Sequence, residues 1–257
     1  MLCTSWRRSV PRANASGTLR VVELSKPVEF TIDGKKVVAR EGETILEAAR
    51  RNGLYIPALC YLEGVSSFGG CRVCVVELKG SPRVFASCVT PVAGGMEVVT
   101  DSEKLRRYRR WAVELLLAER PHVCSVCVAN GSCELQQLAT ELGVDHLRVD
   151  REWTDYEVDL THERFAYDPN RCILCTRCIR VCDEVEGVHT LDLMLRGKNS
   201  KVIFDVDENW GFSQSCTSCG KCSASCPVGA LYVKSKPLSE VKKKDLVSFI
   251  MERRSEK

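Results

Sequence analysis

The sequence predicts an α+β protein built from several small units. The chain has 257 residues, more than one minimal hydrophobic core needs and enough for two or three small units. Before Cys60, a strand-like alternation of apolar residues is followed by a helix-start signal, so strands and a helix share one unit. The chain has sixteen cysteines, and the fifteen from Cys60 onward occur in groups, around which we expect separate units.

These cysteines indicate metal ligands more than disulfides. The N-terminal residues lack the apolar core of a signal peptide, and the longest apolar run, "WAVELLLA", is interrupted by Glu114 and too short to span a bilayer. We therefore expect a cytoplasmic protein with no transmembrane segment. In a reducing cytosol, grouped cysteines are more often metal ligands or redox catalysts than disulfides.

The first 22 residues are basic, with four arginines and no acid, namely Arg7, Arg8, Arg12 and Arg20. Organelle transit peptides have this composition, and so do disordered basic leaders, which we favour here. The arginine pair is not followed by an apolar stretch, which argues against an export signal. A net charge of +3 does not define the partner, because nucleic-acid binding needs a concentrated basic face.

The segment "VEFTIDGKKVVA" predicts a β-hairpin, because alternating apolar residues flank Asp33-Gly34. A helix is expected next, since Thr44 and Glu47 have the spacing of a capping box and Gly53 is suited to end the helix. A hairpin, a helix and a cysteine loop together form a small α+β unit.

Residues 101–119 predict an amphipathic helix. Its expected apolar stripe consists of Leu105, Tyr108, Ala112, Leu115 and Leu116. The remaining positions carry basic residues, which we expect on the exterior: Lys104, Arg106, Arg107, Arg109 and Arg110. A solvated or partner-docking face is favoured over a nucleic-acid site, because Tyr108 falls on the apolar stripe.

Two further segments are expected to connect or extend the units. Residues 148–163 are charged and indicate a connector with some extended structure. Residues 237–257 predict a basic C-terminal helix with a modest apolar face formed by Val241, Leu246, Phe249 and Ile250. Either segment is suited to pack on its own domain or on a partner subunit.

An internal repeat carries the strongest motif. Both copies have the spacing C-x2-C-x2-C-x3-C, and they lie 44 positions apart. The second copy continues into Pro227, as in bacterial two-cluster ferredoxins, in which the fourth cysteine of each run binds the other cluster. We therefore predict two 4Fe-4S clusters, one bound by Cys172, Cys175, Cys178 and Cys226 and the other by Cys182, Cys216, Cys219 and Cys222. Two zinc sites are the less favoured alternative.

The first cysteine group comprises Cys60, Cys71, Cys74 and Cys88. Four thiolates suit a 2Fe-2S cluster, although the spacing differs from that of plant ferredoxins. Gly69 and Gly70, in "FGGC", allow backbone amides to come close to a cluster. A structural zinc site is the alternative.

The segment "RPHVCSVCVANGSC" offers three thiols: Cys124, Cys127 and Cys133. A thioredoxin-like pair is disfavoured because no βαβ pattern surrounds it. His122 provides an imidazole nitrogen, whereas Arg120 stays protonated and cannot be a ligand. We predict His122 as the fourth ligand of a 4Fe-4S cluster, with His146 or a partner residue as the next candidates.

Taken in this order, the four groups resemble the iron-sulfur part of a family of electron-input modules. The family includes the large iron-sulfur subunit of respiratory complex I, the N-terminal part of iron-only hydrogenases, and the small diaphorase subunit of NAD-reducing nickel-iron hydrogenases. The resemblance covers residues from about 20 to 235.

This resemblance implies a succession of domains. The implied order is a disordered leader over 1–19, a β-grasp 2Fe-2S ferredoxin-type domain over 20–100, a small helical His-Cys3 4Fe-4S domain over 101–147, a connector over 148–163, a two-cluster 4Fe-4S ferredoxin-like domain over 164–236, and a basic C-terminal helix or tail over 237–257.

Two features favour a resemblance to the nickel-iron diaphorase subunit. The segments "HVCSVCVANGSCELQ", "RCILCTRCIRVCDEVEGVHTLDL" and "SCTSCGKCSASCPVGALY" are most similar to that member, and the chain ends about thirty residues after Cys226. Complex I and the iron-only enzymes have histidine four residues before the first cysteine, where this chain has Arg120. The H-x-C arrangement of His122 is similar to the nickel-iron version.

The resemblance implies an electron-transfer subunit with one 2Fe-2S and three 4Fe-4S clusters and no catalytic residue of its own. The implied partners are a flavoprotein that binds FMN and NAD(P), and the small and large subunits of a nickel-iron hydrogenase. The sequence has no glycine-rich dinucleotide fingerprint and no Walker loop, so we expect no NAD or FMN bound by this chain. It is expected to be inactive as an isolated chain.

Three alternatives stay open. The same module serves NAD-dependent formate dehydrogenases and other complex I-like NADH-oxidising modules. A free-standing ferredoxin-like carrier is a different class, which stable co-purification of partners would exclude. A zinc-bearing interaction protein would be colourless.

Overall fold

The computed structural model describes residues 27–235, in which helices and strands are mixed as the sequence predicts. The predicted leader over 1–19 and the predicted helix over 237–257 lie outside the described residues.

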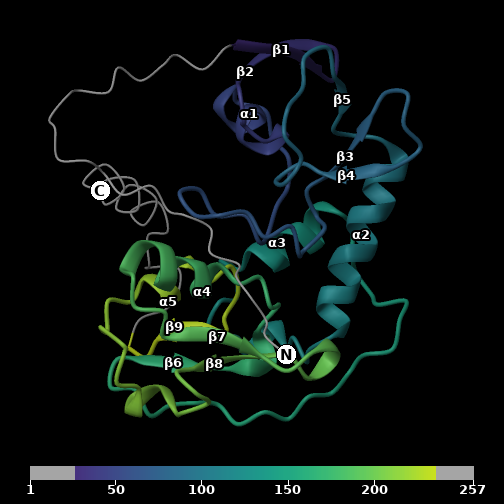
Figure 1. The fold of residues 1–257 in the computed structure, drawn as a ribbon. Coiled ribbons are helices and arrows are strands. Elements are labelled where there is room, and N and C mark those ends of the chain that lie inside the picture. The colour runs from purple at the N-terminus through teal and green to yellow at the C-terminus, as the bar shows by residue number, and fades with distance from the viewer. Residues whose placement is uncertain (1–26, 236–257) are drawn as a thin grey trace, which may run out of the picture.

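A mixed five-stranded sheet forms the first part of the chain, at the top of Figure 1. Its elements are β1 (Pro27–Ile32), β2 (Lys35–Arg40), β3 (Val75–Leu78), β4 (Val84–Ala86), β5 (Glu97–Val99) and the helix α1 (Ile45–Arg51). The strand order is β2-β1-β5-β3-β4, with β1 and β5 parallel and the other pairs antiparallel. The buried residues of α1 pack with Phe30, Ile32 and Val37 of the sheet, so this part has its own apolar core.

The predicted hairpin and helix start are confirmed. Asp33 and Gly34 both have positive φ, as the turn between β1 and β2 requires, and the Asp33 carboxylate accepts from the Thr100 N–H at 2.7 Å. The Thr44 hydroxyl accepts from the Glu47 N–H at 3.3 Å, while the Glu47 carboxylate accepts from the Thr44 N–H at 2.9 Å. This capping box satisfies two backbone donors at the first turn of α1.

The predicted long helix is also confirmed, as α2 (Glu103–Ala118). Its predicted apolar stripe is confirmed for Leu105, Ala112 and Leu116, which are buried or packed against the apolar cluster, and is wrong for the other two residues. Tyr108 and Leu115 are exposed, whereas Arg109 and Glu114 are buried. Arg109 donates to the backbone carbonyls of Val75 and Thr100 at 2.8 and 2.7 Å. Hydrogen bonds to neighbouring segments therefore select the inward face of α2, and apolar periodicity does not show such bonds.

The second part of the chain consists of short elements around the cysteines. Its helices and strands are α3 (Glu134–Glu141), β6 (Phe165–Tyr167), α4 (Arg177–Val181), β7 (Leu191–Met194), β8 (Lys201–Phe204), α5 (Lys221–Ser225) and β9 (Leu231–Val233). The antiparallel pairs β6-β9 and β7-β8 form two small sheets. Helical single turns span Cys124–Val126, Pro169–Arg171, Cys182–Glu186, Gly197–Asn199 and Trp210–Phe212.

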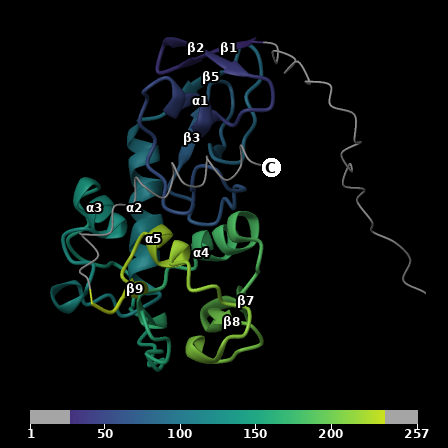
Figure 2. The same cartoon turned by 90° about the vertical axis from the view of Figure 1, so that its left-hand side faces the viewer.

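The two parts pack against each other, and α2 runs along one side from the first part to the second (Figure 1). Figure 2, turned by 90°, shows α3 beside α2 and the short helices α4 and α5 below the first part. One apolar cluster joins Leu59, Cys60 and Val73 of the first part to residues of the second part. The cysteine loops of both parts therefore share a buried interior.

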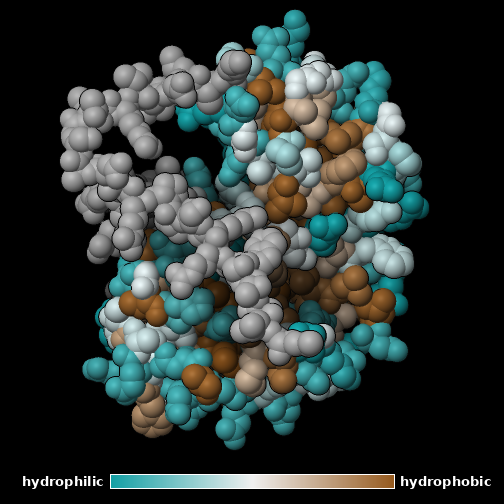
Figure 3. Space-filling view, in the orientation of Figure 1, coloured by the Kyte–Doolittle hydropathy of each residue, from teal (hydrophilic) through white to brown (hydrophobic). Residues whose placement is uncertain are grey.

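On the face shown in Figure 3, hydrophilic residues cover most of the lower rim, and apolar residues gather between the two parts. In the described range 27–235, none of the helices combines the length and the apolar character that crossing a membrane requires.

Candidate iron-sulfur sites

The first cysteine group lies in the loops next to the five-stranded sheet. Cys60 follows the loop after α1, Cys71 and Cys74 come directly before β3, and Cys88 follows β4. All four side chains are buried. The Cys60 N–H donates to Sγ of Cys71 at 3.4 Å, and the thiol of Cys60 hydrogen-bonds with those of Cys71 and Cys88. The structure therefore brings the four predicted sulfurs together.

Contacts between these four thiols lower the pKa values of two of them and raise those of the other two. Hydrogen bonds from Cys71 and Cys88 lower the pKa of Cys60, and a hydrogen bond from Cys88 lowers the pKa of Cys74. The pKa values of Cys71 and Cys88 are raised, chiefly because each forms a hydrogen bond with the sulfur of Cys60. Metal-bound cysteine is a thiolate, so iron binding at this group releases the thiol protons.

Gly69 and Gly70 have a local reason to be glycine. A Cβ on Gly70 would lie 2.2 Å from the ring of Phe68, and Gly69 has a φ of +70°. The backbone of Gly70 hydrogen-bonds with the Cys60 sulfur. Glycine thus allows a backbone N–H to approach a sulfur of the group, as the sequence predicts for a site that holds an anionic cluster.

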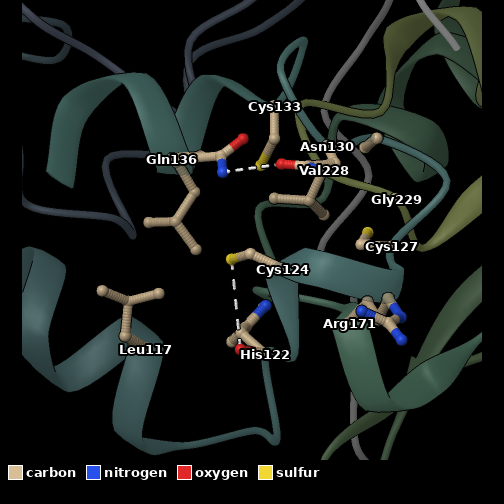
Figure 4. Close-up of a pocket in the computed structure, with 12 residues that line it drawn as sticks. Leu117, His122, Cys124, Cys127, Asn130, Cys133, Gln136, Arg171, Val228 and Gly229 are labelled. Atoms are coloured by element: carbon tan, nitrogen blue, oxygen red, sulfur yellow. Dashed lines mark hydrogen bonds between the residues drawn. The ribbon is translucent and has the colours of Figure 1, made fainter. Parts of the chain in front are cut away.

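The second group surrounds a small cavity between α2, α3 and the loop before β9. Figure 4 shows the sulfur atoms of Cys124, Cys127 and Cys133 and the imidazole of His122 around this space. His146, the alternative ligand, is exposed, does not line the cavity and pairs with Asp145 at 2.8 Å. The structure therefore gathers the four residues that the sequence singles out and leaves His146 apart.

The orientation of His122 bears on its role. Its Nε2 is buried and has no hydrogen-bond partner. Burial, together with the positive charge of Arg171, lowers the pKa of His122 to about 4, so the ring is neutral near neutral pH. A neutral imidazole with an unpaired buried nitrogen is suited to bind a metal, because a buried polar atom without a partner is costly.

The repeated motif surrounds two further small cavities. The sulfur-bearing residues that line the first are Cys172, Cys175, Cys178 and Cys226. Those that line the second are Cys182, Cys216, Cys219 and Cys222. Each motif thus contributes three cysteines to one cavity and its fourth cysteine to the other.

The backbone repeats along with the sequence. Leu174 and Thr176 have positive φ, and so do Ser218 and Gly220, 44 positions later. In each copy the N–H two residues after the first cysteine donates to that cysteine's sulfur at 3.4 Å, from Leu174 in one copy and Ser218 in the other. The same loop conformation therefore aims three sulfurs into each cavity.

These sites are largely buried, and burial raises the pKa of Cys172 to about 12 and that of Cys175 to about 11. The pKa values of Cys178 and Cys222 are also raised by burial. Without a cation, several thiolates packed this closely would repel one another. The donor set therefore fits a cluster whose iron ions compensate the charge of all four thiolates.

Three residues that sequence reasoning did not single out also touch these sites. The indole N–H of Trp210 donates to Sγ of Cys216 at 3.3 Å. The buried side chain of Tyr167 lines the Cys172 cavity. Arg171 lines the His122 cavity and donates to the Val123 carbonyl at 3.0 Å. Of these three residues, only Arg171 could have been connected with a site from the sequence, because it directly precedes Cys172.

Among residues 27–235, no three His, Cys, Asp or Glu side chains are grouped as they would be around a single bound metal ion.

Three sequence families match successive parts of the chain. The 2Fe-2S iron-sulfur cluster binding domain matches residues 25–103. The NADH-ubiquinone oxidoreductase-G iron-sulfur binding region matches 109–148, and the ferredoxin-like domain of NADH-quinone oxidoreductase subunit 3 matches 164–232. A 2Fe-2S domain and 4Fe-4S binding domains are therefore present.

Three curated relatives are much longer than this chain. NADPH-Fe(3+) oxidoreductase subunit alpha of Geobacter sulfurreducens is 40% identical over 214 residues, which are 80% of this chain and 24% of the relative. NADP-reducing hydrogenase subunit HndD of Solidesulfovibrio fructosivorans is 40% identical over 208 residues, 79% of this chain and 35% of the relative. The mitochondrial NADH-ubiquinone oxidoreductase 78 kDa subunit of Candida albicans is 35% identical over 236 residues, 90% of this chain and 31% of the relative. The chain thus spans about a quarter to a third of their length.

A solved structure matches over nearly its whole chain. In a crystal structure of an NAD+-reducing NiFe hydrogenase in the H2-reduced state, one chain is 37% identical with a TM-score of 0.77. The match covers 82% of the present chain and 89% of that chain.

Proposed function

This chain belongs to the family of hydrogenase- and complex I-related iron-sulfur subunits, and we propose that it carries single electrons between a flavoprotein subunit that binds FMN and NAD(P) and a nickel-iron hydrogenase. The observation that carries the proposal is that the sixteen predicted ligands gather into four separate groups within one chain. The 89% coverage of a chain from an NAD+-reducing NiFe hydrogenase supports these partners.

Four ligand sets are proposed. Cys60, Cys71, Cys74 and Cys88 hold a 2Fe-2S cluster, and three 4Fe-4S clusters are held by His122 with Cys124, Cys127 and Cys133, by Cys172, Cys175, Cys178 and Cys226, and by Cys182, Cys216, Cys219 and Cys222. Bound clusters supply reversible one-electron chemistry. The protein itself fixes the directions of the sulfurs through its loops and buries most of them, and iron binding displaces the thiol protons.

We assign no catalytic residue to this chain. Conversion between two-electron and one-electron chemistry belongs to a flavin, and hydrogen chemistry belongs to the hydrogenase partner. Isolated, the chain is expected neither to oxidise NADH nor to oxidise dihydrogen. A cytoplasmic location is proposed because grouped cysteines in a reducing compartment are more often metal ligands than disulfides.

One comparison favours a second candidate for the redox enzyme that exchanges electrons with this module. The 40% identity with NADPH-Fe(3+) oxidoreductase subunit alpha supports a module that carries electrons between NADPH and Fe(3+). An NAD-dependent formate dehydrogenase is the alternative that the sequence resemblance implies. The hydrogenase assignment and this alternative differ in the subunits that co-purify.

Anaerobic native purification tests the proposal. We expect a brown protein with about fourteen irons per chain, the sum for one 2Fe-2S and three 4Fe-4S clusters, together with flavoprotein and hydrogenase subunits. Reconstitution with these partners should restore NAD(P)-dependent hydrogen oxidation. A colourless protein with stoichiometric zinc would contradict the cluster assignment, and NADH oxidation by the flavin-free chain alone would contradict its non-catalytic role.

A further inference from the structure

The loop that carries Cys60 is tied to the helix that carries Cys178. Arg180, on α4, donates through Nη2 to the carbonyls of Cys60 and Cys175, the latter at 3.3 Å. Its Nη1 donates to the Ser66 carbonyl. One side chain therefore binds the backbone of a proposed 2Fe-2S ligand and of a proposed 4Fe-4S ligand.

Other contacts hold the same loop in place. The Ser66 N–H donates to Oε2 of Glu184 at 2.7 Å, in the turn after α4. Beside it, Leu62 and Val65 of the loop pack on Val181 and Val185 in a separate apolar cluster. The position of Arg180 between the two cysteine loops is thus determined by packing on both sides.

Arg180 is only 9% exposed, so its positive charge is largely removed from solvent. Its hydrogen bonds go to three backbone carbonyls and to the Thr176 hydroxyl, all of them neutral acceptors. Because an arginine stays protonated in a protein, a cation lies beside ligands of both proposed clusters.

We propose that Arg180 is a positioning residue that holds the Cys60 loop against the Cys172 site and favours the reduced state of both clusters by its buried charge. The inference rests on the proposed function. An electron that passes between the two clusters oxidises one and reduces the other by one equivalent, and no bond or proton is exchanged. A fixed cation beside both lowers the free energy of whichever holds the electron, because opposite charges attract strongly in a poorly solvated interior.

Three variants of the full chain, purified anaerobically, test the inference. Arg180→Gln removes the charge, and Arg180→Lys keeps the charge but lacks the planar fork that reaches several carbonyls at once. Arg109→Gln is the matched control, because Arg109 is also a buried arginine that donates to two carbonyls, but these belong to Val75 and Thr100 of the first part. The measurements are iron content, EPR-monitored redox titration and the magnetic interaction between the two reduced clusters.

We expect Arg180→Gln to lower the midpoint potentials of both clusters and to weaken their magnetic interaction. Arg180→Lys should keep the potentials closer to those of the wild type but weaken the interaction, and Arg109→Gln should leave the interaction and the potential of the Cys172 cluster unchanged. An iron-replete Arg180→Gln protein with wild-type potentials and interaction would overturn the inference. If the Arg180→Gln protein loses iron, the Arg180→Lys protein provides the test. A magnetic interaction of wild-type strength in Arg180→Lys would then overturn the inference. A wild-type chain without these clusters would instead overturn the proposed function.

Discussion

The unpaired Nε2 of His122 and the pKa of about 4 that burial gives this ring single out one side chain for a sharp test. We predict that His122→Ala loses one iron or admits water or a foreign thiol at that corner. His122→Cys should keep the cluster at a lower reduction potential, because a fourth thiolate adds negative charge. EPR spectra of the reduced variants and iron counts provide the measurement.

His146→Ala is the matched control for His122, since its ring is exposed and pairs only with Asp145 among the described residues. It should keep the iron content and the spectrum of the wild type. A His122→Ala protein with all its iron and an unaltered spectrum would place the fourth ligand elsewhere.

Trp210 offers a second test at a single residue. Its buried indole donates to Sγ of Cys216 at 3.3 Å, and a hydrogen bond to a thiolate favours the reduced cluster. A hydrogen bond is worth about 0.5–1.5 kcal/mol, so Trp210→Phe should lower the potential of that cluster by tens of millivolts, on the order of 20–60 mV for one electron.

Redox titration of the variant measures this shift. Trp153→Phe is the control, because that indole is 72% exposed, and it should leave all potentials unchanged. A Trp210→Phe protein with the wild-type potential would show that the indole does not tune this cluster.

At the scale of elements, the loop before β9 closes the His122 site from the second part of the chain. Gly229 lines that cavity, and a Cβ there would lie 2.7 Å from Sγ of Cys127 and 3.2 Å from Cβ of Ala129. Gly229→Ala should therefore displace the Cys127 loop and reduce the iron content of this cluster, while the first cysteine group keeps its spectrum.

Gly94→Ala provides the comparison, because a Cβ at Gly94 meets nothing within 4 Å and the residue has no positive φ. This variant should bind iron and fold like the wild type. Equal iron content in the two variants would mean that the β9 loop yields to the added methyl group at little cost.

The capping box of α1 gives a prediction on stability. Thr44→Ala removes the side chain that accepts from the Glu47 N–H, and such a loss costs about 1 kcal/mol. Denaturant unfolding of the iron-loaded protein should show this decrease in the free energy of unfolding. Thr140→Ala on α3 is the control, because the exposed Thr140 hydroxyl only donates back to the Gln136 carbonyl. Equal losses in both variants would argue against a specific contribution of the cap.

At the scale of the whole molecule, the cysteine loops and the apolar core are the same region. Cysteines of three groups belong to the cluster of buried residues that joins the two parts. Raised thiol pKa values and crowded sulfurs make this core costly without iron. We therefore predict that the apoprotein is less stable than the iron-loaded protein, since metal binding contributes directly to folding.

Thermal unfolding before and after anaerobic removal of iron with a chelator measures this dependence. The midpoint should fall on removal and recover on reconstitution with iron and sulfide. Equal midpoints for both forms would show that the core packs independently of the clusters.

Local sequence determined much of this protein. The hairpin at Asp33-Gly34 and the capping box at Thr44 depend on neighbouring residues, so the sequence predicted them correctly. The repeat of 44 positions likewise predicted the cysteine loops, because ligands two or three residues apart lie in one turn whose conformation is local. The iron-sulfur family was recognisable for the same reason.

Only the tertiary structure decided which polar residues are buried between segments. Arg109 and Glu114 face inward on α2, while Tyr108 and Leu115 face solvent, against the helical periodicity. Arg180 binds the carbonyl of Cys60, which lies 120 positions away in sequence. Such choices depend on which distant backbone groups lack a hydrogen-bond partner after packing, and the pattern of one segment carries no information about them.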